Sequence, residues 1–351
     1  MSSNQIAPSG QPTKRIEYID ALRGFTMILV VFLHVPSYCL HLAGTDPQVH
    51  NYLQQIRMPM FFFISGFVLY KANVVWNTKQ VISFFRKKIP VQLLSPFVFF
   101  ALYAYSLNIS IIEGSLDASK LGYWYTFTLF IYYVFYASVR FCFRNNYADI
   151  ILLVLGVLLY PIIHPTIFSA IPLSEEIKGF FSICEWNFFI FFVLGTLAKK
   201  HFSQFERILD HTPLLAICIL TYFLVNGFMN LIPINNRIIH YFLSFPGLIV
   251  LFSFFRKKQA VFSKERVLGR TLQYIGRRTL DIYLIHWFLL PRKLKFTFSV
   301  FHDYPMPLIE ATCSLLIAIM IIAAALLIGE IIRLSPFLAH WVFGAKYPTT
   351  K

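Results

Sequence analysis

The chain has 351 residues, of which 57% are hydrophobic and only 13% are charged, with a mean hydropathy of +0.63. A soluble domain is about 45–50% apolar and about 25% charged, so this composition excludes a water-soluble globular protein and also a disordered or fibrous one. The formal net charge of +15 would suit a nucleic-acid binder, but the basic residues lie in short loops between apolar segments. That distribution indicates a membrane protein with no nucleic-acid partner.

Ten apolar segments approach the length of about 20 residues that a membrane-spanning helix needs. In chain order they cover residues 21–42, 58–75, 89–109, 123–143, 150–171, 180–198, 213–232, 240–255, 272–291 and 307–333. The sequence therefore predicts an all-α fold, a polytopic membrane bundle of about ten transmembrane helices. The predicted domain plan is a polar N-terminal tail over 1–14, a membrane-embedded domain over 15–335 and a short C-terminal tail over 336–351.

The basic residues gather in alternate loops, and this asymmetry predicts the orientation in the membrane. The clusters on the side of the N-terminus are Arg86-Lys87-Lys88, Lys199-Lys200, Arg256-Lys257-Lys258 and Arg277-Arg278. The exception on the other side is the group Arg292, Lys293 and Lys295. Positive loops stay inside, so both termini are expected in the cytoplasm and the protein in the inner, cytoplasmic membrane.

The five cysteines are scattered, and most lie inside apolar segments. They are Cys39, Cys142, Cys184, Cys218 and Cys313, and no C-x-x-C spacing occurs. This pattern predicts neither a disulfide framework nor a zinc site, and we expect no bound metal.

The first apolar segment carries a strip of polar side chains. Arg23 and His34 are eleven positions apart, which is three helical turns plus about 20°, so the two share one face. Tyr38 and His41 extend that face, and Asp20 lies close to its start. Ionisable side chains inside a bilayer are energetically unfavourable, so the strip is expected to face the bundle interior or a water-filled cavity.

His34 is the candidate general base of this strip, because an imidazole titrates near neutral pH. It lies about 21 Å along the helix from Asp20, and therefore beyond the midplane of a hydrocarbon core about 30 Å thick. A cytoplasmic donor substrate would need a long thin arm to reach it. A purely structural interpretation pairs Arg23 with Asp20 at the helix end and bonds His34 to a neighbouring carbonyl.

Six sequence blocks, in order between residue 15 and about residue 290, carry a family resemblance. They are Asp20-x-x-Arg23-Gly24 followed by His34, then residues 58–67 (MPMFFFISGF), 85–90 (FRKKIP), 123–125 (YWY), 191–195 (FFVLG) and 275–286 (IGRRTLDIYLIH). The ordered set resembles the acyltransferase 3 family of integral membrane O-acyltransferases. Asp281 departs from the pattern, because the family often has a small or aromatic residue there.

The resemblance implies an enzyme that moves an acyl group, most often acetyl, from acyl-CoA on the cytoplasmic side to a hydroxyl of a surface polysaccharide or lipid-linked sugar. Acyl-CoA, here acetyl-CoA, is then the donor substrate, and no bound cofactor is expected. The other partners are the carbohydrate acceptor and the lipid bilayer. In this interpretation His34 is the base, and Arg23 and Asp20 orient the helix end or line the donor path.

Two further groups of residues are candidates for substrate binding. Basic side chains suit the phosphates of coenzyme A, and the cluster expected to bind them is Arg86, Lys87 and Lys88. Polar-tipped side chains are candidates for lining the cavity, and they are Tyr38, Trp124, Tyr283 and His286. The alternatives are that the basic cluster serves topology alone and that the aromatic residues belong to the core or to an interfacial belt.

Two other functions are compatible with the composition. A transporter or flippase would use the Arg23 and His34 face as a substrate or proton path. Transporters of that kind often show repeated halves, and no internal repeat is visible in this sequence. A structural membrane protein would leave the polar face of the first helix unexplained.

Overall fold

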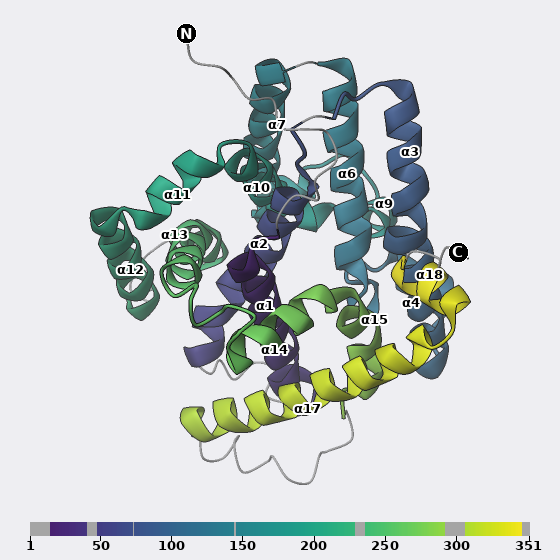
Figure 1. Ribbon diagram of the computed structural model, residues 1–351. Coiled ribbons are helices and arrows are strands. Elements are labelled where there is room, and N and C mark those ends of the chain that lie inside the picture. The colour runs from purple at the N-terminus through teal and green to yellow at the C-terminus, as the bar shows by residue number, and fades with distance from the viewer. Residues whose placement is uncertain are drawn as a thin grey trace, which may run out of the picture.

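The computed structural model describes residues 15–40, 48–72, 74–143, 145–228, 236–291 and 306–345. Within these ranges the chain forms helices and turns and no strand, so the predicted all-α fold is confirmed (Figure 1). Residues 1–14, His41 and the basic group Arg292, Lys293 and Lys295 lie outside the described residues.

The described helices follow one another with short connections. In chain order they are α1 (Glu17–Tyr38), α2 (Gln48–Leu69), α3 (Thr78–Ile89), the π-helical segment η1 (Pro90–Leu94), α4 (Ser95–Ser106), α5 (Ile111–Leu116), the 3₁₀ segment η2 (Lys120–Gly122), α6 (Trp124–Cys142), α7 (Asn145–Leu159), η3 (Tyr160–Ile163), α8 (Pro165–Ser169), α9 (Glu175–Phe180), η4 (Ile183–Phe188), α10 (Phe189–Lys200), α11 (Phe202–Asp210), α12 (Thr212–Gly227), α13 (Asn236–Lys257), α14 (Val267–Arg277), α15 (Thr279–Leu289), α17 (Pro307–Arg333) and α18 (Pro336–Phe343). The predicted C-terminal tail therefore contains a helix, α18, and its first turn is capped by the side chain of Ser335.

Among the described residues, three helical segments are long and apolar enough to cross a membrane: Glu17–Tyr38, Thr78–Ser106 and Pro307–Arg333. The pair α11 and α12, bent by 69°, adds a fourth if it forms one span. The protein is thus a helical bundle that contains helices able to cross a membrane, whereas the ten predicted spans are not confirmed. Polar residues interrupt several of the predicted spans, and the one predicted over 272–291 is divided at Arg278 between α14 and α15.

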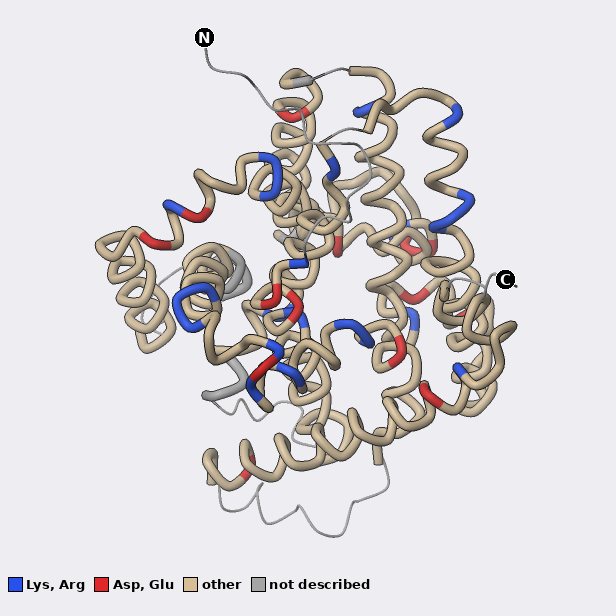
Figure 2. Tube along the Cα trace, viewed as in Figure 1, with Lys and Arg blue, Asp and Glu red and all other residues tan. Residues whose placement is uncertain are grey.

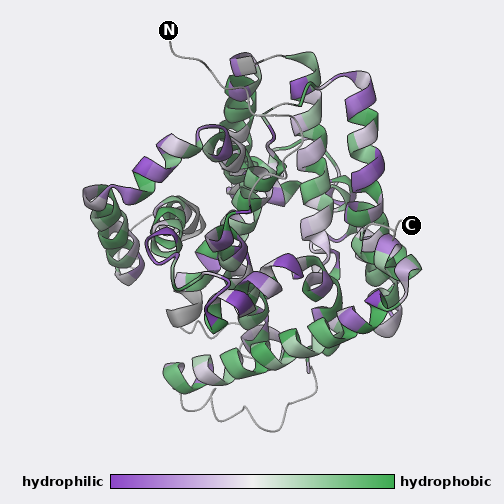
Figure 3. Cartoon of the chain, in the orientation of Figure 1, coloured by the Kyte–Doolittle hydropathy of each residue, from purple (hydrophilic) through white to green (hydrophobic). Residues whose placement is uncertain are grey.

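Helix α1 lies inside the bundle, as its polar strip requires. Of its apolar window, 72% is buried within the protein, compared with 28% for each of the other two candidate spans. It packs against α2, α14 and α17 (Figure 1). In contrast, α17 is hydrophobic along most of its length and charged only near its ends (Figures 2 and 3). The face of α17 turned away from the protein therefore suits lipid.

Reciprocal glycines bring two pairs of helices into backbone contact. A Cβ built on Gly24 of α1 would lie 2.0 Å from the carbonyl oxygen of Leu272 in α14, and one on Gly276 would lie 2.0 Å from that of Asp20. Between α2 and α10, Gly66 and Gly195 make the same kind of contact, and a Cβ built on either would lie 1.9 Å from a carbonyl oxygen of the partner helix. Membrane helices approach this closely only where small residues meet.

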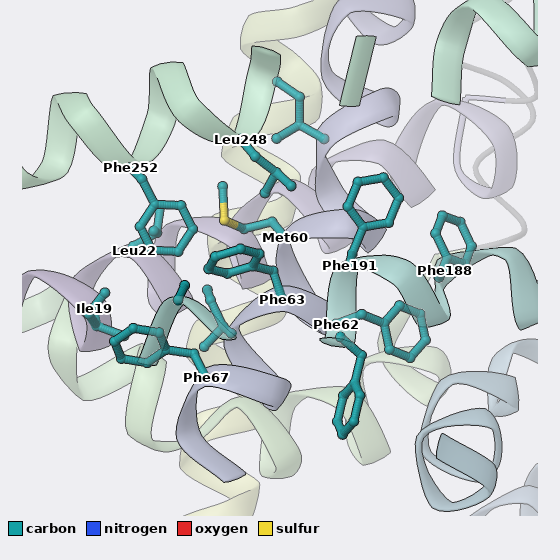
Figure 4. Close-up of a cluster of buried hydrophobic side chains, with 14 of the residues drawn as sticks. Ile19, Leu22, Met60, Phe62, Phe63, Phe67, Phe188, Phe191, Leu248 and Phe252 are labelled. Atoms are coloured by element: carbon teal, nitrogen blue, oxygen red, sulfur yellow. The ribbon is translucent and has the colours of Figure 1, made fainter. Parts of the chain in front are cut away.

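The abundant aromatic residues build the interior as well as the surface. Phe62 of α2 packs against Phe188, with ring centroids 5.5 Å apart, and Phe63 packs against Phe252 of α13 at 4.9 Å (Figure 4). Several of the largest side chains in this cluster are fully buried, including Phe62 and Phe191. An aromatic content of 18% suits lipid-facing and interfacial surface, but a large part of these side chains packs inside the helix bundle.

A buried ion pair ties α15 to α17. Asp281 is 2% exposed, and its carboxylate accepts hydrogen bonds from Nε and Nη2 of Arg333 at 2.9 and 2.7 Å. The Arg333 guanidinium also lies over the ring of Phe343, 4.3 Å from its centroid, which joins α18 to the same point. The residue that departs from the family pattern thus has a structural partner on the last long helix.

The connection between α5 and α6 is tied to α9 through Lys120. Its Nζ donates to the carbonyl oxygens of Gly179 at 2.9 Å and Ser115 at 3.2 Å, and it lies over the ring of Phe127. Burial lowers the pKa of Lys120 to about 8, because removal from water disfavours the charged form. These bonds help to hold the following residue pair, Leu121 and Gly122, against the bundle.

Candidate active site

A cavity of about 630 Å³ lies among helices α1, α2, α3, α6, α14, α15 and α18. Ligand pockets in proteins are typically about 300–1,000 Å³, so this one is large enough for a substrate or a large part of one. Its described lining combines segments that are far apart in the sequence: Arg23 and His34 from α1, Arg57 from α2, Lys87 and Lys88 from α3, Trp124 from α6, Arg277 from α14, and Tyr283 and His286 from α15.

The polar strip of α1 points into this cavity. Arg23, Met27, Val30 and His34 all line it, and their spacing of three and four residues is that of one helical face. Of the helical face inferred from the sequence, the part that carries Arg23 and His34 therefore lines the cavity. Burial of α1 within the bundle keeps the guanidinium and the imidazole away from lipid.

The cavity is strongly cationic. Among its described lining residues there is no Asp or Glu, while the cations are Arg23, Arg57, Lys71, Lys87, Lys88 and Arg277. Lys87 and Lys88 belong to the last turn of α3, where cations interact favourably with the helix dipole. Lys88 lies over the ring of Tyr133, with Nζ 4.7 Å from its centroid. Such a group of cations attracts an anion such as a phosphate.

Aromatic rings surround His34. The centroid of its imidazole lies 4.6 Å from the ring of Trp287 and 5.7 Å from the nearly parallel ring of His286. Both neighbours also line the cavity. The cavity thus offers two kinds of chemistry, charge for binding an anion and imidazole nitrogen for moving a proton.

Three predicted site residues lie off the cavity. Arg86 is exposed on α3 and does not line the cavity, whereas Lys87, which is also exposed, and Lys88 do line it, because a helix turns about 100° per residue. Asp20 lies in the first turn of α1, where its carbonyl oxygen packs on Gly276. Tyr38 lies behind His34, with ring centroids 5.7 Å apart.

The structure adds lining residues that the sequence interpretation missed, chiefly Arg57 and Trp287. The second apolar segment predicted from the sequence begins at Met58 and excludes Arg57, whereas α2 begins at Gln48 and includes Arg57 well inside the helix. The rule that an ionisable residue inside a membrane helix indicates function would have found it. Trp287 directly follows His286 and had no separate signal.

Comparison with protein families decides the family. A family model described as an acyltransferase domain, Acyl_transf_3, matches residues 16–329. The chain belongs to the acyltransferase 3 family. Comparisons with curated proteins and with solved structures gave no significant match.

The fold explains why the acyltransferase 3 blocks belong together. The glycine of the first block, Gly24, contacts the block over 275–286 through Gly276, and the block over 58–67 contacts that over 191–195 through Gly66 and Gly195. These contacts place α1 beside α14 and α2 beside α10. Because α1, α2 and α14 each contribute lining residues, blocks that lie far apart in the sequence meet at the cavity.

Proposed function

We propose that this acyltransferase 3 protein transfers an acyl group, which we take to be acetyl, from acyl-CoA to a hydroxyl of a surface polysaccharide or lipid-linked sugar. The observation that carries the proposal is that a buried histidine and a group of cations share one cavity. The thioester arm of acyl-CoA can extend toward His34 while its phosphates stay with cations such as Lys87 and Lys88. Family membership supports an acyl-transfer reaction.

In the proposed mechanism, His34 accepts the proton of the acceptor hydroxyl as the hydroxyl oxygen bonds to the thioester carbonyl carbon. The tetrahedral intermediate carries negative charge on its oxygen and needs a nearby donor or cation. Arg57 is suited to this task, because it lines the cavity and is close enough to His34 to interact with it electrostatically. When the C–S bond breaks, the CoA thiolate receives the proton from His34, and the products are an ester and free CoA.

The other predicted residues receive supporting tasks in this proposal. Arg23 and Asp20 orient the cytoplasmic end of α1 and the donor path, and Tyr38, Trp124, Tyr283 and His286 surround the acceptor. Arg86, which lies off the cavity, has no part in donor binding in this proposal. In this proposal the protein lies in the cytoplasmic membrane with both termini in the cytoplasm, where acyl-CoA is available.

Labelled acetyl-CoA tests the reaction directly. Purified protein in detergent is expected to release CoA and to acylate an alcohol acceptor, and the surface glycans of cells that carry the intact gene are expected to be heavier by acetyl groups than those of cells without it. Mass spectrometry of the glycan and a thiol assay for CoA measure the two effects. A transporter or flippase would cleave no thioester, so failure of both assays would contradict the proposal.

The two inward lysines of α3 provide a test of the donor site. Lys87→Ala combined with Lys88→Ala is expected to raise the KM for acetyl-CoA by about tenfold or more and to change kcat less, because charge-assisted hydrogen bonds to phosphate contribute about 1.5–3 kcal/mol each. Steady-state CoA release measures both constants. Arg86→Ala is the matched control, since Arg86 shares the helix but is off the cavity, and its KM is expected to stay unchanged. An unchanged KM in the double variant would contradict donor binding by the two lysines and leave them a role in membrane topology alone.

A further inference from the structure

His286 has one ring nitrogen satisfied and the other without a partner. Its Nδ1 lies 2.9 Å from the carbonyl oxygens of both Ile282 and Tyr283 in its own helix. Carbonyl oxygens only accept, so Nδ1 carries the proton in the neutral ring and Nε2 holds a lone pair. The side chain is 0% exposed, and Nε2 has no hydrogen-bond partner in the part of the chain that the structure describes.

Trp287 offers the complementary group next to it. The indole is 4% exposed, and its Nε1–H also lacks a partner within the described ranges. Gly122 packs so closely on this ring that a Cβ there would lie 2.1 Å from the ring carbons, so the indole is held in place. Both residues line the cavity, and their ring centroids are 4.9 Å apart.

A lone pair beside an N–H donor fits a hydroxyl group. A hydroxyl donates through its hydrogen and accepts through its oxygen, so one such group satisfies both buried atoms. The His34 ring lies 4.6 Å from Trp287 and 5.7 Å from His286, which puts this position beside the atom that would deprotonate the acceptor. A hydroxyl bound here therefore belongs to the same acceptor molecule and lies near the hydroxyl that is acylated.

We propose that His286 and Trp287 bind a second hydroxyl of the acceptor, adjacent to the one that receives the acyl group, and thereby select 1,2-diols such as those of a sugar ring. The inference rests on the proposed acyl transfer. An acceptor that lacks the second hydroxyl leaves both buried groups unpaired, and sites built to bind a hydroxyl discriminate strongly against such analogues.

The experiment compares two small acceptors, trans-cyclohexane-1,2-diol and cyclohexanol, with full-length protein in detergent and labelled acetyl-CoA. The diol is expected to be acetylated with a kcat/KM at least about tenfold higher than that of the mono-alcohol. In His286→Phe, which keeps a ring but has no nitrogen, the ratio is expected to fall to about one. His286→Gln supplies an acceptor oxygen and is expected to restore part of the preference, and melting temperatures show that each variant is folded.

His201→Gln is the matched control, because this histidine is exposed at the end of α10 and does not line the cavity. It is expected to keep the wild-type ratio. Equal use of the two alcohols by the wild type, a ratio retained in His286→Phe, or acetyl-CoA cleavage stimulated by neither alcohol would each overturn the inference. Absence of any acetyl-CoA cleavage by the wild type would instead contradict the proposed function, so the two failures are distinguishable.

Discussion

Replacing His34 with glutamine is expected to lower kcat for acyl transfer by about 10²- to 10⁴-fold, which is the usual contribution of a positioned general base. The His34 side chain lines the cavity and is enclosed by Trp287 and His286. An exposed side chain therefore cannot replace it as the base. Single-turnover release of CoA measures the chemical step apart from product release.

A lower kcat together with an unchanged affinity for the donor would identify His34 as a base and not as a donor-binding residue. CoA binding to His34→Gln, measured by titration calorimetry, is expected to match the wild type, because the phosphates are assigned to the lysines of α3. His201→Gln serves again as control and is expected to be fully active. Normal turnover in His34→Gln would remove His34 as the base and leave the cavity as a binding site alone.

The second large effect concerns the glycines at the helix crossings. Gly24→Ala is expected to destabilise the protein by about 3 kcal/mol or more, because the added methyl would lie 2.0 Å from a backbone oxygen of Leu272 that no rotamer change can move. To accommodate it, α1 must separate from α14. Since these helices carry Arg23 and Arg277 to the cavity, acyl transfer should also decline in any folded fraction.

Thermal unfolding in detergent, monitored by size-exclusion chromatography, measures this loss of stability. Gly276→Ala is expected to be similarly severe, and the double variant less severe than the sum, because the first methyl already separates the two helices at this crossing. The control is Gly227→Ala at the end of α12, where no atom of the described residues outside its own helix and chain neighbours lies within 4 Å of the new Cβ, and it should be neutral or slightly stabilising. A Gly24→Ala protein as stable as this control would show that the crossing tolerates a wider separation.

Helical periodicity predicted the most informative part of the site. The spacing of Arg23 and His34 defines one face of one helix, and a charged face cannot remain in lipid, so both its existence and its inward direction followed from local sequence and solvation. The same reasoning could not separate Arg86 from Lys87 and Lys88. Three consecutive basic residues are equivalent in a sequence, and only the rotation of α3 against its neighbours decides which of them reach the cavity.

The partners of single polar groups were also beyond the reach of the sequence. Asp281 looked like an isolated departure from a family pattern until Arg333, 52 residues later, proved to hold its carboxylate. His286 was predicted as a cavity residue, but the state of its two nitrogens depends on where the carbonyl groups of α15 lie. The apolar segments of the sequence indicated membrane helices in general. They did not give the number of spans, because some apolar helices in the bundle are short or bent.

Composition and local spacing thus determined by themselves that the chain is a helical membrane protein, that it resembles acyltransferase 3 and that α1 carries an inward polar strip, because these properties depend on transfer to lipid and on the pitch of one helix. The tertiary structure alone decided which distant segments meet. Contacts at Gly24, Gly66, Gly195 and Gly276 depend on surfaces separated by up to hundreds of residues, and no local energy term specifies them. The shape of the cavity, and the unpaired nitrogens of His286 and Trp287 within its wall, follow from those contacts.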